Sequence, residues 1–359
     1  MKSYRGILAC LVLAWTVLLS GNVSHAQNRR AFTLVGLAEL PRLFAPQLSP
    51  DGTTLAYFVS TTDWKTNRLV VHLWRQPTAG GAPQQLTFTD GGDQPVVRWS
   101  PDGRTLLFAR AGQFMLMPAD GGEARALTSH PTAVAAPTWS PDGTAVYFTA
   151  PDPRTSDERE RDRLRDDVYA FDENYKPRQL WKIVVSTGAE AQITTGALTV
   201  NEYRLSQDGR RIAVQRAPTP YDDDARRGEL WMMDASGENA RALTSNAIEE
   251  RLIDISPDNS QLLFLADTNE RFEPYYPTTI FVVAATGGTP RALLSDFRYA
   301  IDQALWAPDG RSIIATVNMG VHSEFYQIDV GAHRARQITD GQHYIPPSWS
   351  LLRSRQVYR

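Results

Sequence analysis

A four-residue turn recurs along this chain and limits its fold more than any other feature. It reads SPDG or a close variant, and it occurs six times. The copies lie at 49–52, 100–103, 140–143, 206–209, 256–259 and 307–310. Proline fixes φ at the first central position, aspartate accepts local backbone hydrogen bonds, and glycine or asparagine tolerates the left-handed conformation that follows. Each copy therefore predicts a tight turn between two strands.

The same order of segments surrounds every turn. An apolar residue precedes it, and two strand-like runs and a small-residue turn follow. A closing segment such as RALT then ends each unit, at 84–87, 125–128, 191–194, 241–244, 291–294 and 336–339. Each unit therefore predicts four short antiparallel strands, which form a sheet too small to be stable alone.

Such sheets must bury their faces against copies of themselves, and radial stacking produces a β-propeller. The predicted fold class is all-β: a β-propeller of four-stranded blades, with six complete blades at 43–344 and the start of a truncated seventh at 345–359. Trp349 and Ser350 begin the turn motif again, but Leu351 follows in place of proline. A linear β-solenoid is the alternative, although its repeats are usually shorter.

Two polar insertions, at 151–179 and 217–228, lengthen the third and fourth units. Both alternate or cluster charged residues. They predict solvated loops with a turn or two of salt-bridged helix. The alternative is a rim element that covers a substrate entrance or docks another domain.

The N-terminus has the layout of a secretory signal peptide. Lys2 and Arg5 precede an apolar run at 7–19, and SHA at 24–26 has the small residues of a cleavage site. We therefore predict a signal peptide at 1–26, a lead-in at 27–42, and a periplasmic or secreted product. The apolar run is short for a retained anchor, and no other stretch is long enough to span a bilayer. Lipidation at Cys10 ranks below simple export.

Composition excludes several classes of function. The chain is 42% hydrophobic and 21% charged, with a net charge of −3. No large positive field is available to hold nucleic acid, so that partner is not expected. Cys10 is the single cysteine, and its loss with the signal peptide would exclude disulfides and cysteine chemistry.

Several segments resemble one known family in the same order. These are FTLVGLAELPRLFAPQLSPDGTTLAYFVS at 32–60, then RWSPDGRTLLFARAG, GGEARALT and DDVYAFDENYKPRQLW. They are similar to secreted bacterial members of the prolyl oligopeptidase family, the dipeptidyl-peptidase and acylaminoacyl-peptidase-like serine peptidases. The resemblance covers 32 to about 350. The SPDG repeats alone are less specific, because TolB-like propellers use similar ones. Those proteins begin with a separate α/β domain, for which 27–42 leaves no room.

The resemblance implies that a propeller precedes an α/β-hydrolase domain whose nucleophile sits in G-x-S-x-G. The 359 residues contain no such motif. The nearest string, GRSII at 310–314, has Ile314 at the second glycine position, and Ser312 belongs to a hairpin strand. No catalytic residue is therefore expected in this chain, which we interpret as a truncated or incomplete peptidase, inactive alone.

The implied function is the non-catalytic propeller portion of an exported serine peptidase, which gates the access of short peptides to a hydrolase domain in cis. The alternative is a stand-alone periplasmic TolB-like propeller that acts as a scaffold for binding a protein or ligand.

Candidate substrate contacts lie on the strand before each SPDG turn, which we expect to be innermost. Two residues before the turn, Arg98, Arg204 and Asp254 could present charge to a channel and orient peptide termini. The alternative is that they pair with one another or contact solvent. Glu249 and Glu250 invite comparison with the paired glutamates that hold a substrate amino terminus in dipeptidyl peptidases, but adjacent strand residues point to opposite faces.

No cofactor and no metal site is expected. The histidines of the mature chain have no zinc-site spacing, and the acidic runs lack a calcium-loop pattern. They are His72, His130, His322, His333 and His343. The segment VHSEF around His322 is interpreted as a strand with alternating faces.

Overall fold

The computed structural model describes residues 33–89, 92–166, 168, 170, 174–225, 227–246, 248–346, 349 and 351. The predicted signal peptide therefore lies outside the described residues, as do Ser348 of the inner-strand register and the tail 352–359. The chain forms two compact units, 1–40 and 41–359.

The described part of the first unit contains one short helix, α2 (Leu34–Glu39). Its first turn is capped by Thr33, whose hydroxyl accepts a hydrogen bond from the Gly36 N–H at 2.9 Å. No pattern in the sequence predicts this helix. All its side chains remain at least partly exposed.

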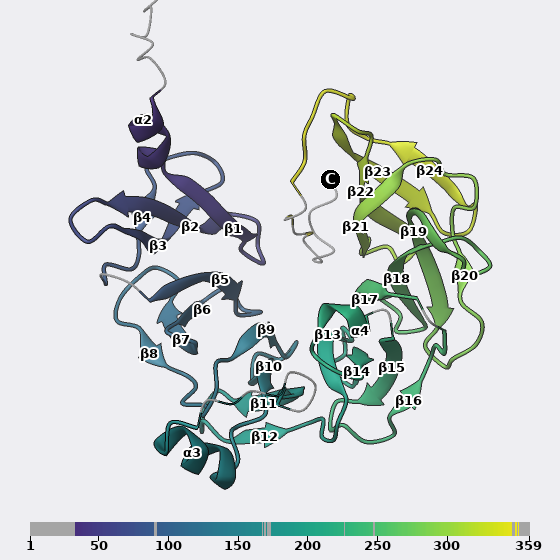
Figure 1. Ribbon diagram of the computed structural model, residues 1–359. Coiled ribbons are helices and arrows are strands. Elements are labelled where there is room, and N and C mark those ends of the chain that lie inside the picture. Colours follow the sequence, from purple (N-terminus) through teal and green to yellow (C-terminus); the bar gives the residue numbers. More distant parts are fainter. Residues whose placement is uncertain are drawn as a thin grey trace, which may run out of the picture. The chain divides into compact units, whose positions relative to one another are not determined.

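The second unit contains six four-stranded antiparallel sheets among its described residues, and we call them blades one to six in chain order (Figure 1). Blade one comprises β1 (Arg42–Leu48), β2 (Thr54–Asp63), β3 (Arg68–Pro77) and β4 (Gln84–Gln85). Blade two comprises β5 (Asp93–Trp99), β6 (Thr105–Arg110), β7 (Gln113–Pro118) and β8 (Arg125–Ala126). Blade three comprises β9 (Ala135–Trp139), β10 (Ala145–Pro151), β11 (Arg178–Val184) and β12 (Glu190–Gln192).

The remaining blades have the same strand order. Blade four comprises β13 (Thr199–Leu205), β14 (Arg211–Ala217), β15 (Glu229–Asp234) and β16 (Arg241–Ala242). Blade five comprises β17 (Glu250–Ile255), β18 (Gln261–Thr268), β19 (Pro274–Ala284) and β20 (Arg291–Ala292). Blade six comprises β21 (Ala300–Trp306), β22 (Ser312–Asn318), β23 (Ser323–Asp329) and β24 (Arg334–Gln337). The predicted four-strand repeat is confirmed.

The SPDG turns close through side chains as well as backbone. In blade one, the Ser49 hydroxyl donates to the Asp51 carboxylate at 2.6 Å and accepts the Thr54 N–H at 2.9 Å. The same carboxylate accepts the Thr53 N–H at 3.0 Å, and Gly52 has a φ of 74°. The serine–aspartate bond recurs in the turns that start at 100, 140, 206 and 256. Each turn therefore satisfies its own backbone donors locally.

The closing segments act through their final threonine. The Thr87 hydroxyl accepts the buried Leu73 N–H of the third strand at 2.9 Å. Equivalent bonds join Thr128 to Phe114, Thr194 to Leu180, Thr244 to Leu230 and Thr339 to Phe325. Blade five has Leu294 at this position. The threonine thus pins the chain to the third strand as it leaves each of five blades.

Every pairing between a first and a second strand contains a register shift. In blade one it falls between Phe44 and Gln47, and in blade five between Arg251 and Asp254. The other four blades show the same irregularity. A bulge of this kind bends the strand and changes the direction of the side chains beyond it.

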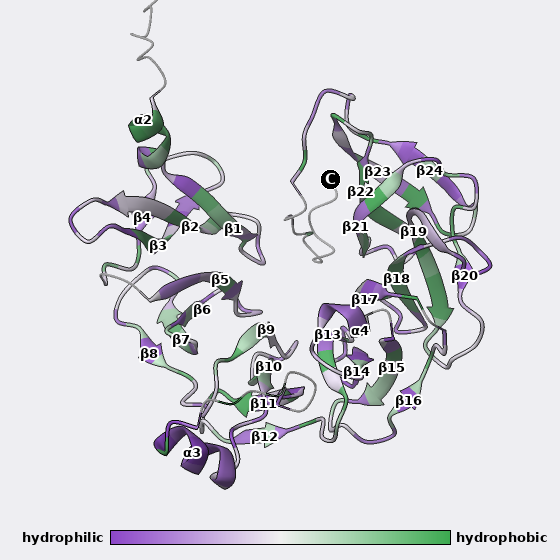
Figure 2. Ribbon diagram, viewed as in Figure 1, coloured by the Kyte–Doolittle hydropathy of each residue, from purple (hydrophilic) through white to green (hydrophobic). Residues whose placement is uncertain are grey.

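The blades bury apolar faces against one another. Phe114 of blade two and Phe148 of blade three are fully buried and meet edge to face, with ring centroids 5.9 Å apart. First strands also contact each other, β1 with β5, β5 with β9, β13 with β17 and β17 with β21. Figure 2 shows the central strands of the later blades, such as β19 and β22, as mostly hydrophobic. This is the packing predicted for a β-propeller.

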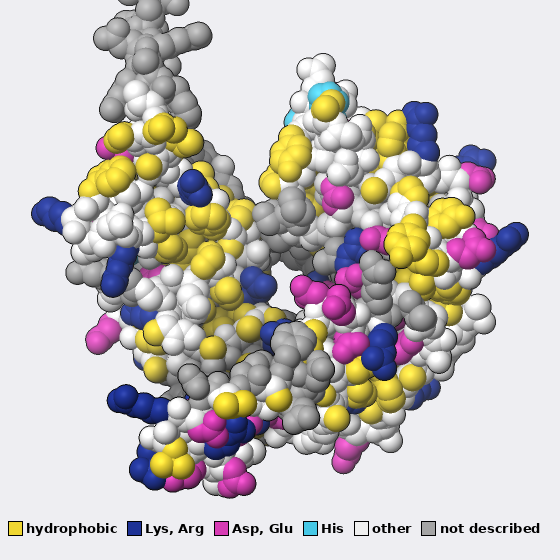
Figure 3. Space-filling view, in the orientation of Figure 1, with side chains coloured by type: hydrophobic (Ala, Val, Ile, Leu, Met, Phe, Trp, Pro, Cys, Tyr) yellow, Lys and Arg dark blue, Asp and Glu magenta, His cyan; other side chains and the backbone are white. Residues whose placement is uncertain are grey.

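The two polar insertions contain the other described helices. In the first, α3 (Ser156–Arg163) begins with a capping box between Thr155 and Glu158, and Arg163 pairs with Glu160 at 2.6 Å. Its acidic and basic side chains alternate at the bottom of Figure 3. The second insertion contains α4 (Asp222–Ala225). The prediction of a solvated, salt-bridged helix is confirmed for the first insertion.

The two insertions touch through Tyr175 and Tyr221, whose ring centroids lie 5.7 Å apart. Whether they also cover an entrance stays a prediction. None of the described helices has the length and apolar character needed to cross a bilayer.

Candidate functional site

Two of the predicted arginines influence each other electrostatically although they come from different blades. Arg98 lies next to the last residue of β5 in blade two, and Arg204 lies next to the last residue of β13 in blade four. Burial lowers the pKa of Arg98, and the charge of Arg204 lowers it further. This electrostatic influence reaches across blade three, which lies between them in the sequence. Two strands therefore direct positive charge toward a common region.

Tyr203 fixes the strand that carries Arg204. Its hydroxyl, buried with the rest of the side chain, lies 2.6 Å from the Ala136 carbonyl oxygen and 2.8 Å from that of Tyr147. Burial raises the pKa of Tyr203, so the hydroxyl stays protonated, and its single O–H is shared as a hydrogen-bond donor between these two carbonyl oxygens. Blade three and blade four are joined at this point.

The charge around the two arginines is not balanced. Among the described residues, Arg204 forms an ion pair with Glu202 at 3.6 Å, and the Arg204 side chain is 38% exposed. The Arg98 guanidinium donates to the Val97 carbonyl at 2.9 Å, and no carboxylate forms an ion pair with it within the described parts of the chain. An anionic group of a ligand would be attracted here, because guanidinium groups bind carboxylates strongly.

The structure places two of the predicted contacts elsewhere. Asp254 is 1% exposed, and its carboxylate accepts the Trp306 N–H at 3.0 Å, which joins blade five to blade six. Glu250 is also 1% exposed and accepts hydrogen bonds from the Thr244 hydroxyl at 2.6 Å and the Asn246 amide at 2.8 Å. A substrate cannot reach either carboxylate in this structure. The half-buried Glu249 precedes β17, and its role stays a prediction.

Glu250 has an acidic neighbour in Glu229. Burial raises the pKa of both carboxyl groups, and it raises that of Glu250 to about 7 with a contribution from the charge of Glu229. Glu229 accepts the Asn246 N–H at 2.7 Å. The pair lies inside the protein where blade four passes to blade five, so its effect is on stability rather than on a ligand.

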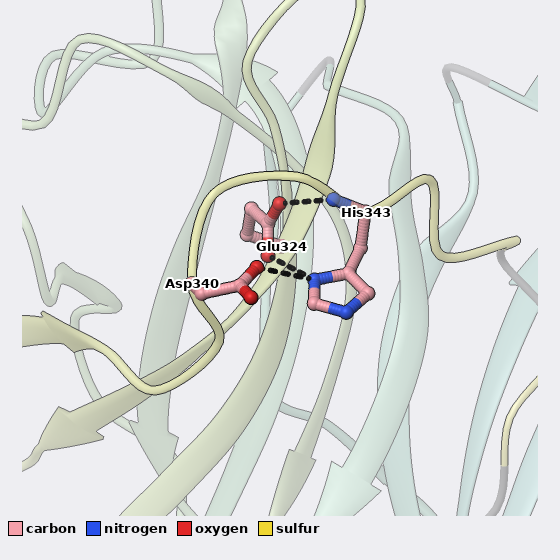
Figure 4. Close-up of side chains that lie close together, drawn as sticks. All are labelled: Glu324, Asp340 and His343. Atoms are coloured by element: carbon pink, nitrogen blue, oxygen red, sulfur yellow. Dashed lines mark hydrogen bonds and ion pairs between the residues drawn. The ribbon is translucent and has the colours of Figure 1, made fainter. Parts of the chain in front are cut away.

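A second group of ionisable side chains lies where the chain leaves blade six (Figure 4). Glu324 belongs to β23, and Asp340 and His343 lie in the loop after β24. The His343 Nδ1 atom is 3.3 Å from the Glu324 Oε2 atom and 3.1 Å from the Asp340 Oδ1 atom. Glu324 is fully buried, whereas the other two side chains are exposed. One ligand atom from each residue lies within 4.8 Å of the others.

Part of this group repeats a structural contact of other blades. The Glu324 Oε1 atom accepts the His343 N–H at 2.7 Å, and the Thr339 hydroxyl donates to the other carboxylate oxygen. In blade two the Gln113 Oε1 atom accepts the His130 N–H at 2.9 Å in the same way. In both blades this residue is a histidine, and the His130 ring pairs with Glu190 at 2.8 Å. The addition in blade six is the Asp340 carboxylate.

No local sequence motif marks the whole group, because Glu324 precedes His343 by 19 residues along the chain. The predicted strand at VHSEF is confirmed from Ser323 onward, where β23 contains Glu324. The local signal was the pair Asp340 and His343, whose spacing of three residues lets both side chains meet one partner.

No protein-family model matches the chain. Curated proteins match it over part of their length. The chain is 29% identical over 208 residues to an uncharacterized peptidase, YuxL, of Bacillus subtilis, which covers 52% of the chain and 31% of the relative. It is 24% identical over 346 residues to dipeptidyl-peptidase 5 of Porphyromonas gingivalis, which covers 85% of the chain and 48% of the relative. The chain thus spans between a third and a half of the length of these relatives.

Solved structures share the fold. The acylaminoacyl peptidase of Pyrococcus horikoshii matches with a TM-score of 0.62 at 14% identity, over 86% of this chain and 48% of that one. The β-propeller domain of the Trilobed protease from Pyrococcus furiosus matches with a TM-score of 0.58 at 13% identity, over 85% of both chains. The chain is a β-propeller similar to those of prolyl oligopeptidase-family peptidases.

Beyond blade six of this propeller, Trp349 occupies the register of the earlier turn tryptophans. Its ring meets the Phe325 ring edge to face, with centroids 5.1 Å apart. Trp139 of blade three similarly packs against the apolar cluster that blades two and three share. The seventh blade itself stays a prediction, because most of 347–359 lies outside the described residues.

Proposed function

We propose that this chain is the non-catalytic propeller portion of an exported serine peptidase, and that it controls the access of short peptides to an α/β-hydrolase domain. The observation that carries the proposal is the similarity to dipeptidyl-peptidase 5, which extends over 85% of the chain. The fold shared with an acylaminoacyl peptidase supports it. The signal-peptide pattern at 1–26 supports export.

The propeller acts by exclusion and by charge. A narrow opening admits a short extended peptide but not a folded chain. Arg98 and Arg204 contribute an excess of positive charge that attracts the free carboxylate of a peptide. Arginine suits this task because its planar guanidinium can form two parallel hydrogen bonds with a carboxylate. The proposed substrates are therefore short peptides with a free C-terminus.

The test is a peptidase assay on the exported product of the natural gene, beside the purified residues 27–359. We expect the exported protein to cleave aminoacyl and dipeptidyl chromogenic substrates and to react with a fluorophosphonate probe. The purified propeller should neither cleave these substrates nor react with the probe. In the exported protein, Arg98→Ala and Arg204→Ala should each raise KM about tenfold for peptides with a free C-terminus. This change corresponds to a loss of about 1.4 kcal/mol in binding free energy.

The KM for peptides with an amidated C-terminus should not change in these variants. Arg210 is exposed, and Arg210→Ala is the matched control, which should leave both KM values unchanged. Fluorophosphonate labelling of residues 27–359 alone would contradict the non-catalytic assignment. A natural product that binds peptides but cleaves none would favour the stand-alone scaffold instead. An unchanged KM in both arginine variants would remove their proposed role.

A further inference from the structure

We propose that Glu324, Asp340 and His343 form a binding site for a divalent transition-metal cation at the end of blade six. The site lies apart from Arg98 and Arg204, which belong to blades two and four. It needs no hydrolase domain, because all three side chains come from β23 and the loop that follows β24.

The three ligand atoms already have the spacing of a coordination shell. The His343 Nδ1 atom lies 3.3 Å from the Glu324 Oε2 atom and 3.1 Å from the Asp340 Oδ1 atom. Bonds from a metal such as Zn²⁺ to nitrogen and oxygen are about 2.0–2.2 Å long, which sets neighbouring ligand atoms about 3.0–3.5 Å apart. An ion can therefore enter between them with small side-chain movements (Figure 4).

The charge of the group favours a cation. Two carboxylates face the same imidazole nitrogen, which carries at most one proton. Among the described residues, no Lys or Arg forms an ion pair with Glu324 or Asp340. Even a protonated His343 would leave one negative charge in excess, and a divalent cation would balance both carboxylates while imidazole stays neutral.

The contact that ties the loop to β23 does not explain all three side chains. That contact needs the Glu324 carboxylate and the His343 N–H. In blade two its counterpart, Gln113, binds the His130 N–H, and the residue after the closing threonine is Ser129. Blade six has Asp340 at that position. Blade two also has an imidazole here, that of His130, but its Nδ1 atom pairs with a single carboxylate, Glu190, at 2.8 Å. The second carboxylate facing the imidazole in blade six, Asp340, therefore has no counterpart there.

The group combines one buried ligand residue with two exposed ones, which suits a metal site that an ion can enter. The buried Glu324 is fixed by the Thr339 hydroxyl, which orients it before an ion arrives. The Asp340 side chain is 69% exposed and that of His343 50%, so an ion can enter and water can complete its coordination. One imidazole and two carboxylates with open positions suit Mn²⁺ or Zn²⁺ better than Ca²⁺, which prefers oxygen ligands alone.

The test is calorimetric titration of EDTA-treated residues 27–359 with Mn²⁺ and Zn²⁺. We expect saturable binding of one ion per chain. Asp340→Asn and His343→Ala should each weaken it at least about tenfold. Both side chains are exposed, so the fold should tolerate their loss. Asp296→Asn and His322→Ala change exposed residues outside the group and should leave the affinity within about twofold.

A second measurement needs no variant. Diethylpyrocarbonate modifies accessible histidines, and mass spectrometry locates the modified residues. Saturating Zn²⁺ should protect His343 and leave the exposed His322 reactive. The proposal is overturned if no ion binds, if both variants bind as the wild type does, or if Zn²⁺ protects the two histidines equally.

Discussion

At the scale of single residues, burial decides what a carboxylate does. Glu250 sits in a 1%-exposed position beside Glu229, and this environment raises the pKa of Glu250 from 4.5 to about 7. The folded protein thus binds a proton that the unfolded chain releases between these values. Stability from this group is fully present below pH 4.5 and is lost as the pH rises through 7.

Glu250→Gln should remove this pH dependence. The variant keeps a polar side chain between Thr244 and Asn246 but has no charge to bury. We expect the free energy of unfolding of the wild type to fall by up to about 3 kcal/mol relative to the variant between pH 5 and pH 8. Urea unfolding at several pH values measures this difference. Glu249→Gln is the control, and an equal effect there would refute the assignment.

At the scale of elements, side-chain hydrogen bonds within a blade hold its turns and its closing segment. The SPDG turn binds its backbone through serine and aspartate, and the closing threonine binds the third strand. Hydrogen bonding also affects the pKa of the turn aspartates: the Ser140 hydroxyl is the largest cause that lowers the pKa of Asp142 to about 2. These contacts explain why the short fourth strands hold their places with so few ladder bonds.

Thr194→Val tests this role in blade three. The change leaves the buried Leu180 N–H without the hydroxyl that now accepts its hydrogen bond at 2.9 Å. An unsatisfied buried donor costs about 1–3 kcal/mol, so the free energy of unfolding should fall by that amount. Denaturant unfolding measures it. Thr195 is exposed, and Thr195→Val is the control. If both variants lose the same free energy of unfolding, the hydrogen bond between Thr194 and Leu180 does not contribute to stability.

At the scale of the whole molecule, neighbouring blades stabilise each other through apolar clusters that they share. Phe148 joins blades two and three through Phe114, and Trp306 joins blades five and six. Repeat architectures of this kind depend on nearest-neighbour interfaces, so damage at one interface is felt first by the two blades that form it.

Phe148→Ala should therefore destabilise the protein locally. Removal of a fully buried phenylalanine ring costs about 3–5 kcal/mol. Hydrogen exchange followed by mass spectrometry should show faster exchange in β6, β7, β10 and β11 than in the wild type, with smaller changes in β22 and β23. Phe88→Ala, which removes a ring that is 72% exposed, is the control. Uniform acceleration in all six blades would contradict the nearest-neighbour description.

Not every regular feature could be predicted from the sequence. The turns were predictable because their hydrogen bonds are local, with at most five residues between Ser49 and Thr54 in blade one. The four-strand units were predictable because the same segments recur in the same order. The register shift in every first strand, such as that between Arg251 and Asp254, was not predicted. A proline lies within the shift of blades one to three, as Pro46, Pro95 and Pro137, but no proline or glycine marks it in blade five. No single residue type therefore signals the bulge, which depends on how the strand meets its neighbours.

The sequence by itself determined the repeat, the turns and the strand order of each blade, because local backbone preferences and the period of apolar residues specify them. Only the tertiary structure decided which charged side chains stay accessible. It buried Asp254 against Trp306, placed Arg98 within the electrostatic influence of Arg204, and joined Glu324, Asp340 and His343 at one loop. The reason is physical: the burial and neighbours of a side chain depend on contacts between segments far apart in the chain, and a repeated turn carries no information about them.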